Sequence, residues 1–227
     1  MKRFFNVAGP CFKTMHYMIE ASTRLQGVEQ LVEMGQYFVI HASRQSGKTT
    51  CLKDLTSRLN AAGEYYTLYC SLESLQGVAD AEKGVPGILD SLVMALENSA
   101  VPFQYDECYE QDKRNRPLVV LTQFLSELSR SLDKRLVIFL DEADCLSEST
   151  LIAFLRQLRS GYNNRDVTPF IYSLALVGMR NIRDYKVHIR PDRESLGSAS
   201  PFNIVTESLT LKNFTRAEIA GLYGQHT

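Results

Sequence analysis

The chain has 227 residues, of which 44% are apolar and 22% charged, and its formal net charge is −1. This length and composition predict one soluble globular domain over residues 1–227 with a large core, and the near-neutral charge gives no global field that would attract nucleic acid. The five scattered cysteines form no C-x-x-C pair, so neither a zinc site nor a disulfide framework is indicated, and a reducing cytoplasm fits. No apolar run approaches the roughly 20 residues that a membrane span needs.

The first part of the chain predicts an irregular segment, a short helix, a strand and a longer helix. Residues 1–26 show no clear period, and residues 28–34 read as a short helix. The apolar run at residues 37–40 reads as a strand. An amphipathic run then predicts a helix over about residues 48–62, with Gly63 as its stop signal.

The loop between this strand and this helix has the sequence A-S-R-Q-S-G-K-T-T. In the phosphate-binding pattern G-x-x-x-x-G-K-[ST], backbone N–H groups hold phosphate oxygens, the Lys reaches the β- and γ-phosphates, and the hydroxyl reaches Mg²⁺. The loop therefore predicts a nucleoside triphosphate as ligand, against the alternative of a Gly-Lys helix start without a ligand. The residues of this candidate site are Ala42, Ser43, Arg44, Gln45, Ser46, Gly47, Lys48, Thr49 and Thr50.

Ala42 departs from the pattern, because it stands at the position of the first Gly. If this position needs a positive φ, an Ala costs roughly 1–2 kcal/mol there. If the position needs only a small side chain, an Ala serves as well as a Gly.

The middle of the chain predicts a second strand at residues 65–70 and an amphipathic helix at residues 87–98. Residues 99–116 are polar and charged and read as a surface excursion. Pro117 reads as the start of another helix. Four apolar residues of that helix fall on one stripe: Leu121, Phe124, Leu125 and Leu128.

A continuous apolar run at residues 136–140 predicts a strand that is buried on both faces of a parallel sheet. Asp141 and Glu142 follow it directly, at the end of the strand where open α/β sheets bind ligands. Asp141 would hold Mg²⁺ through water, and Glu142 would orient or deprotonate an attacking water. The alternative is a solvated Asp-Glu turn.

The last third predicts a helix that Ser147 caps, that runs through Ser160 and that Gly161 ends, then a buried strand at residues 170–177 and a last strand at residues 203–211. Residues 190–201 read as a loop. Thr215 opens a final helix with the capping-box pattern T-x-x-E. Strands that alternate with helices imply an α/β fold, with a mostly parallel sheet and helices on both faces.

Two further groups of residues are candidates for the site. Arg180 and Asn181 follow the strand at residues 170–177, and either could sense the terminal phosphate or place the water, unless both are surface polar residues. The segment 156–193 is locally basic. It could form a solvated face, supply an arginine to a neighbouring subunit's nucleotide, or contact nucleic-acid phosphates.

Several segments together resemble the AAA-like ATPase domain of bacterial P-loop proteins, a group near the archaeal-type ATPases and the STAND signalling ATPases. The resemblance covers nearly the whole chain. Its segments are FFNVAGP, YFVIHASRQSGKTT, LVIFLDEAD, FLRQLRSGY, SLALVGMRNIRDYK and SPFNIVTESLTLKNFT with LYGQHT.

This resemblance implies a three-layer α/β/α P-loop NTPase fold of the AAA type, with a five-stranded sheet in the order 5-1-4-3-2, and ATP with Mg²⁺ as ligands. It places Lys48 and Thr49 at the phosphate and Mg²⁺ positions, and Arg180 or Asn181 at the sensor position. It also implies that Tyr17 to Ile19, within the segment 1–26, lie against the adenine. Related ATPases continue into a lid that this chain lacks, so we expect a fragment or a minimal core that hydrolyses ATP slowly.

The leading hypothesis is a Mg²⁺-dependent ATPase that acts as a nucleotide-driven switch, with self-association or a protein partner open. One alternative is a P-loop phosphotransferase that acts on a small molecule. Another is a nucleotide-binding interaction platform without turnover. A DNA-binding loader is a weaker hypothesis, because the net charge is neutral and no winged-helix segment is present.

Overall fold

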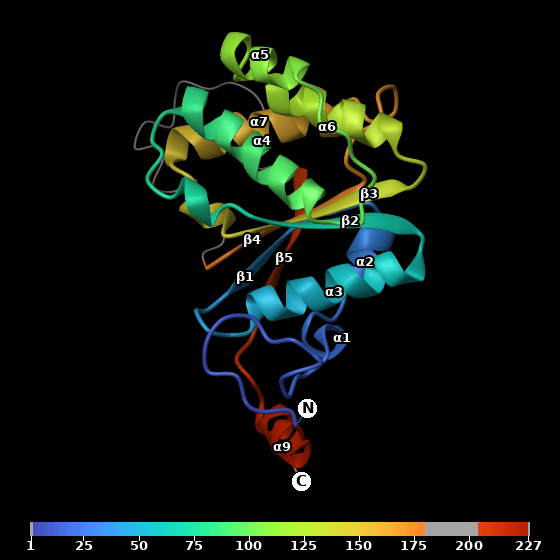
Figure 1. Ribbon diagram of the computed structural model, residues 1–227, viewed down its shortest axis with the longest axis vertical. Helices are drawn as coiled ribbons and strands as arrows, with labels where there is room; N and C mark the ends of the chain where they lie inside the picture. The colour runs from blue at the N-terminus through green and yellow to red at the C-terminus, as the bar shows by residue number, and fades with distance from the viewer. Residues whose placement is uncertain (1, 180–203, 227) are drawn as a thin grey trace.

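The alternation of apolar runs and amphipathic segments builds one five-stranded sheet between two layers of helices (Figure 1). The computed structural model describes residues 2–179 and 204–226. The strands stand in the order β2-β3-β4-β1-β5, and every pairing is parallel. This is the expected order 5-1-4-3-2 in reverse, so the predicted fold is confirmed. The strands are β1 (Tyr37–Ala42), β2 (Tyr65–Ser71), β3 (Arg135–Asp141), β4 (Ser173–Gly178) and β5 (Val205–Leu211).

Alternate residues of each central strand enter two different cores. In β1, Phe38 and Ile40 pack against one helical layer, whereas Tyr37 and Val39 pack against the other. The first layer contains α1 (Ala21–Arg24), α2 (Val28–Glu33) and α3 (Lys48–Ala62). The second contains α4 (Ala81–Glu97), α6 (Val120–Ser131) and α7 (Glu148–Asn163), and α5 (Cys108–Asn115) lies on α6. Figure 1 shows the two layers on opposite sides of the sheet.

Both chain termini lie beside the last helix, α9 (Arg216–Gly224), at one end of the molecule (Figure 1). The capping box at its start is formed as expected. The Thr215 side chain accepts from the Glu218 N–H, and the Glu218 side chain accepts from the Thr215 N–H. The short 3-10 helices η1 (Glu73–Leu75) and η2 (Ala143–Cys145) follow β2 and β3.

Several predicted boundaries are wrong. The fourth helix begins at Ala81 instead of residue 87, because the Asp80 side chain accepts from the Glu82 N–H and caps it. The segment 99–116 contains α5, whose Tyr109 is buried. The strand expected at residue 170 begins at Ser173.

Gly161 does not end α7, which continues to Asn163. A Cβ atom on Gly161 would lie 2.2 Å from the Phe170 ring. This glycine is therefore needed for close approach of an aromatic ring and not as a helix stop.

The segment 1–26 contains the four-residue helix α1. The helix predicted from residue 28 to 34 ends at Glu33. The expected loop at residues 190–201 lies outside the described residues. No helix in the described part of the chain has the length and apolar character to cross a membrane.

Candidate active site

The central strands end at one edge of the sheet, and the two charged motifs leave the sheet there. In the pairing of β1 with β4, His41 lies opposite Gly178, and β3 runs to Asp141 beside β4. The loop 42–50 therefore starts next to the place where Glu142 begins its turn. This is the edge at which open α/β sheets bind ligands.

The loop 42–50 is held in shape by its own polar side chains and by two left-handed residues. Gln45 has a φ of +59° and Gly47 a φ of +81°. The Ser46 hydroxyl donates to the Ser43 carbonyl oxygen at 2.8 Å. α3 begins immediately afterwards at Lys48, so the N-terminus of this 15-residue helix faces the loop.

Ala42 costs the loop no backbone strain. It is the last residue of β1 and 2% exposed, within the core beneath α3. Among the described residues other than glycine, only Gln45 and Glu142 have a positive φ. The first position of this loop therefore needs a small apolar side chain and not a glycine.

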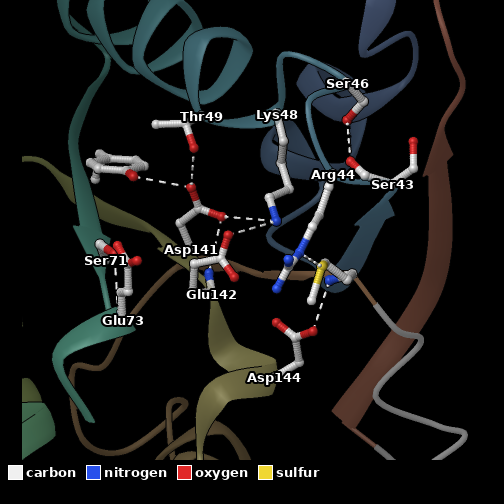
Figure 2. A network of polar contacts seen from close by, with 12 residues as sticks. Ser43, Arg44, Ser46, Lys48, Thr49, Ser71, Glu73, Asp141, Glu142 and Asp144 are labelled. Atoms are coloured by element: carbon white, nitrogen blue, oxygen red, sulfur yellow. Dashed lines mark hydrogen bonds and ion pairs between the residues drawn. The ribbon is translucent and has the colours of Figure 1, made fainter. Parts of the chain in front are cut away.

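Lys48, Asp141 and Glu142 form one charged network with Thr49 (Figure 2). The Lys48 ammonium lies 3.0 Å from Glu142 Oε1 and 3.7 Å from Asp141 Oδ1. The Thr49 hydroxyl donates to Asp141 Oδ2 at 2.7 Å. Side chains that are about 90 residues apart in the sequence thus meet at a single point, as the two motifs predict.

The two adjacent carboxylates have different surroundings. The Asp141 side chain is 1% exposed, whereas that of Glu142 is 32% exposed. Glu142 has a left-handed backbone, with a φ of +56° and a ψ of 34°, and its Oε1 faces the same Lys48 ammonium as Asp141 Oδ1. A non-glycine residue in this region costs roughly 1–2 kcal/mol, so the surrounding structure holds Glu142 in place.

Tyr69 of β2 is a member of the network that the sequence did not reveal. Its hydroxyl donates to Asp141 Oδ2 at 3.0 Å. Burial raises the pKa of Tyr69 well above its ordinary value, and the Asp141 charge raises it further, so the phenol stays protonated and donates. The segment Y-Y-T-L-Y-C marks a strand but not which tyrosine would reach the acidic motif.

The oxygen atoms at this point suit a magnesium ion. Mg²⁺ in nucleotide sites is bound through one or two carboxylates, a hydroxyl and substrate phosphates, with waters completing the shell. The Thr49 hydroxyl and the Asp141 carboxylate are in direct contact and come from the predicted positions. These two residues could therefore share one hard cation.

The end of β4 forms the third side of the site. The Met179 N–H donates to Asp144 Oδ2 at 2.9 Å, and the Met179 sulfur lies 3.2 Å from Arg44 Nε. Asp144 was visible in the sequence as the end of the motif L-D-E-A-D, but without an assigned role. Arg180 and Asn181 lie outside the described residues, so the choice of sensor stays a prediction.

The N-terminal segment lies against α3 and α9. The Cys11 N–H donates to the Thr50 hydroxyl at 3.0 Å. Tyr17 is buried and its hydroxyl lies 3.1 Å from His226 Nδ1, while Ile19 is half-buried. The adenine contact of Tyr17 and Ile19 stays a prediction.

Arg24 links this N-terminal segment to the loop and to α9, and no local pattern of residues indicates this role. Its guanidinium donates to the carbonyl oxygens of Ser46 and Lys212 and lies 3.5 Å from Glu218 Oε1. The side chain is 3% exposed and stacks over the Phe214 ring at 3.8 Å. One buried cation thus joins three segments.

In the basic segment 156–193, Arg165 makes contacts within the fold. Arg165 donates to the Gly35 carbonyl oxygen at 3.0 Å and lies over the Tyr162 ring at 3.9 Å. Arg165 therefore stabilises the fold near the start of β1 and does not contact the loop 42–50.

Comparison with known proteins identifies the family of this fold. The model of the AAA domain matches residues 33–185. No curated protein sequence matches the chain.

Solved structures share the fold at low sequence identity. The chain superposes on the Walker-type ATPase of Pyrococcus abyssi with a TM-score of 0.64 and 15% identity, and the match covers 97% of this chain and 60% of that one. For a chain in the structure of Drosophila ORC bound to poly(dA/dT) DNA and Cdc6, the TM-score is 0.56 and the sequence identity 12%, and the match covers 90% of this chain and 30% of that one. For Cdc6p from Pyrobaculum aerophilum, the TM-score is 0.51 and the sequence identity 16%, and the match covers 89% of this chain and 50% of that one. This chain thus spans less than two thirds of the length of each.

Proposed function

Because the chain belongs to the AAA domain family, we propose that it binds ATP with Mg²⁺ at the carboxyl edge of its sheet and hydrolyses the nucleotide as a molecular switch. The observation that supports this most directly is the network in which Lys48 and Thr49 of the loop meet Asp141 and Glu142. A solvated Asp-Glu turn would not bury Asp141 against a lysine and a threonine from another element.

Lys48 and the start of α3 bind the phosphates. The ammonium lies 3.0 Å from Glu142, and the β- and γ-phosphates of ATP compete with this carboxylate for it. Backbone N–H groups of the loop and the N-terminus of α3 add a positive potential. Binding therefore releases Glu142 from Lys48 at the moment when a reacting phosphate arrives.

Glu142 then acts as the general base. The water oxygen attacks the γ-phosphorus, the bond between that phosphorus and the β–γ bridging oxygen breaks, and ADP leaves with the electron pair. Glu142, 32% exposed and next to the buried Asp141, accepts the proton of the water. Tyr69 holds Asp141 in position through its hydroxyl. Thr49 and Asp141 would hold Mg²⁺, which would supply positive charge to neutralise the phosphates.

Arg24 supports the role as a switch. Its guanidinium joins the Ser46 carbonyl oxygen of the loop to Lys212 and Glu218 at α9. A movement of the loop on nucleotide binding therefore reaches α9. Such a movement would change the affinity of this chain for a second copy of itself or for a protein partner. That the chain does not bind nucleic acid stays a prediction.

The proposal is tested by measuring Mg²⁺-ATP binding by calorimetry together with phosphate release. Lys48→Ala should abolish binding, since it removes the buried phosphate ligand. Glu142→Gln should keep binding and lower turnover by about 10²–10⁴-fold, the usual contribution of a general base. Lys83→Ala on α4, an exposed lysine away from the site, is the control for loss of one charge.

Equal ATP affinity in Lys48→Ala and the wild type would refute the site. Binding by the wild type without phosphate release would refute hydrolysis and support the platform alternative. Transfer of the γ-phosphate to a metabolite, with no free phosphate, would support a phosphotransferase.

A further inference from the structure

Ser43, Arg44 and Ser46 of the loop 42–50 have different roles: the two serines hold the loop, and Arg44 crosses the site. The Ser46 hydroxyl turns back to the Ser43 carbonyl oxygen, and the Ser43 hydroxyl donates to Asn213 Oδ1 at 2.9 Å. Arg44 instead extends from the loop after β1 toward the end of β4, where its Nε lies 3.2 Å from the Met179 sulfur. Figure 2 shows it beside Lys48, pointing toward Asp144.

The surface on which Arg44 rests is fixed by Asp144. The carboxylate of Asp144 accepts the Met179 N–H at 2.9 Å. Gly178 lies so close that a Cβ atom there would be 2.5 Å from Asp144 Oδ1. The backbone at the end of β4 is therefore tied to the segment after β3, and Met179 gives the arginine a defined, uncharged support.

The charges in the site leave room for a second cation. Lys48 faces two carboxylates, Asp141 and Glu142, so this network carries one uncompensated negative charge before any phosphate arrives. No ion pair within residues 2–179 and 204–226 joins Arg44 to a carboxylate, and the contact with Met179 engages only one of its five N–H donors. Its planar guanidinium is suited to binding two phosphate oxygens at once.

We propose that Arg44 is a catalytic arginine supplied by the chain itself, whose guanidinium binds the terminal phosphate of ATP opposite Lys48. This inference rests on the proposed function. In phosphoryl transfer, negative charge builds up on the γ-phosphoryl and leaving oxygens, and an arginine aimed at them contributes about 10³–10⁵-fold to turnover. Arg44 stabilises that charge while Glu142 takes the proton of the water.

The first test compares ATP with ADP, because only ATP carries the terminal phosphate. Arg44→Ala should lower turnover by about 10³-fold and weaken ATP binding by about tenfold, the usual value of a charged hydrogen bond. ADP binding should stay within about twofold of wild type. Arg44→Lys keeps the charge but loses the paired donors, and should regain ATP affinity more than turnover. Arg114→Ala, an exposed arginine on α5, should behave as wild type.

An equal loss of ATP and ADP affinity in Arg44→Ala would overturn the inference, because it would show that the arginine only shapes the loop. Wild-type turnover by Arg44→Ala would overturn it as well. A wild type that fails to bind or hydrolyse ATP would instead refute the proposed function.

A mixing experiment tests whether the arginine serves its own site. Arg44→Ala retains Glu142, and Glu142→Gln retains Arg44, so a mixture of the two regains turnover only if one chain supplies its arginine to another. We expect no recovery and a specific activity that is independent of protein concentration. Recovery in the mixture would overturn the assignment to the same chain.

Discussion

Within the helical layer of α4, α6 and α7, buried side chains are mostly apolar and the backbone follows ordinary preferences. Leu89, Phe124 and Phe154 are all at most 1% exposed. At the carboxyl edge of the sheet, by contrast, a lysine and an aspartate are buried, at 8% and 1% exposure, and the non-glycine residues Gln45 and Glu142 have left-handed backbones.

This difference shows that one region stabilises the fold, whereas the other positions the charged side chains of the site. Apolar burial in the helical layer contributes free energy of folding in proportion to the area removed from water. Buried charges and positive φ angles cost free energy unless partners offset them. The site therefore depends on the helical layer for its folding free energy. Substitutions in the helical layer should lower stability, whereas substitutions in the site should change nucleotide binding or turnover.

The largest expected effect on stability is that of Phe154→Ala in the helical layer. Removing a ring that is 1% exposed leaves a cavity and should lower the free energy of unfolding by about 3–5 kcal/mol. Chemical denaturation measures this. Met94→Ala on α4, where Met94 is 65% exposed, should change it by less than about 0.5 kcal/mol. Similar values for both variants would show that α7 does not supply the core.

The next largest effect on the free energy of unfolding should be that of Gly161→Ala. A Gly-to-Ala change inside a helix normally stabilises by about 0.5–1 kcal/mol. Here the new Cβ would lie 2.2 Å from the Phe170 ring, so we expect a loss of about 1–3 kcal/mol instead. The double variant with Phe170→Leu should recover part of it in the same denaturation assay. A stabilised Gly161→Ala would contradict the close packing of α7.

Gln45 tests the strain at the site. Its side chain is exposed and its φ is +59°, a region that glycine occupies without cost. Gln45→Gly should therefore be more stable than Gln45→Ala by about 1 kcal/mol, the reverse of the usual order. Thermal unfolding of the two variants decides the sign. If Gln45→Ala is the more stable, the loop is not strained at this residue.

The smallest effect should be the acid sensitivity of Asp54 on α3. Burial acts to raise the pKa of Asp54, but the hydrogen bonds from Lys13 and from the Ala21 N–H outweigh it and hold the pKa below its ordinary value. The stabilisation is then complete above the unfolded pKa, about 3.9, and is lost as the pH falls through the folded pKa.

The Lys13 side chain is half-exposed, so we expect a contribution of about 1 kcal/mol or less. The difference in unfolding free energy between the wild type and Asp54→Asn should be constant near neutral pH and shrink below about pH 4. The same difference at pH 3 and pH 7 would show that the charge of Asp54 contributes nothing.

Much of the site was predictable because its signals are local. α3 spans the expected residues 48–62, since Gly47 turns the chain into it and Gly63 turns the chain out. The apolar run before Asp141 forms β3 as predicted. The strand order, however, came from resemblance to a family, because the pattern of one chain does not state which strands are neighbours.

The start of α6 shows why other predictions failed. It begins at Val120 and not at Pro117, and no side chain of its own caps it. Gln157 of α7 accepts the N–H groups of Leu121 and Thr122 at 3.0 and 3.1 Å. These N–H groups have no partner within the helix, so the boundary was decided by a residue more than 30 positions away.

The sequence by itself determined the elements whose start, stop and buried face are encoded within a few neighbouring residues: the loop 42–50, α3, β3 and the capped start of α9. Only the tertiary structure decided that Tyr69 would hold Asp141, that Arg24 would join the loop to α9, and that Arg44 would reach Met179. The physical reason is that hydrogen bonds and ion pairs between distant segments depend on strand order and on the direction of each side chain, and neither leaves a periodic signal in the chain.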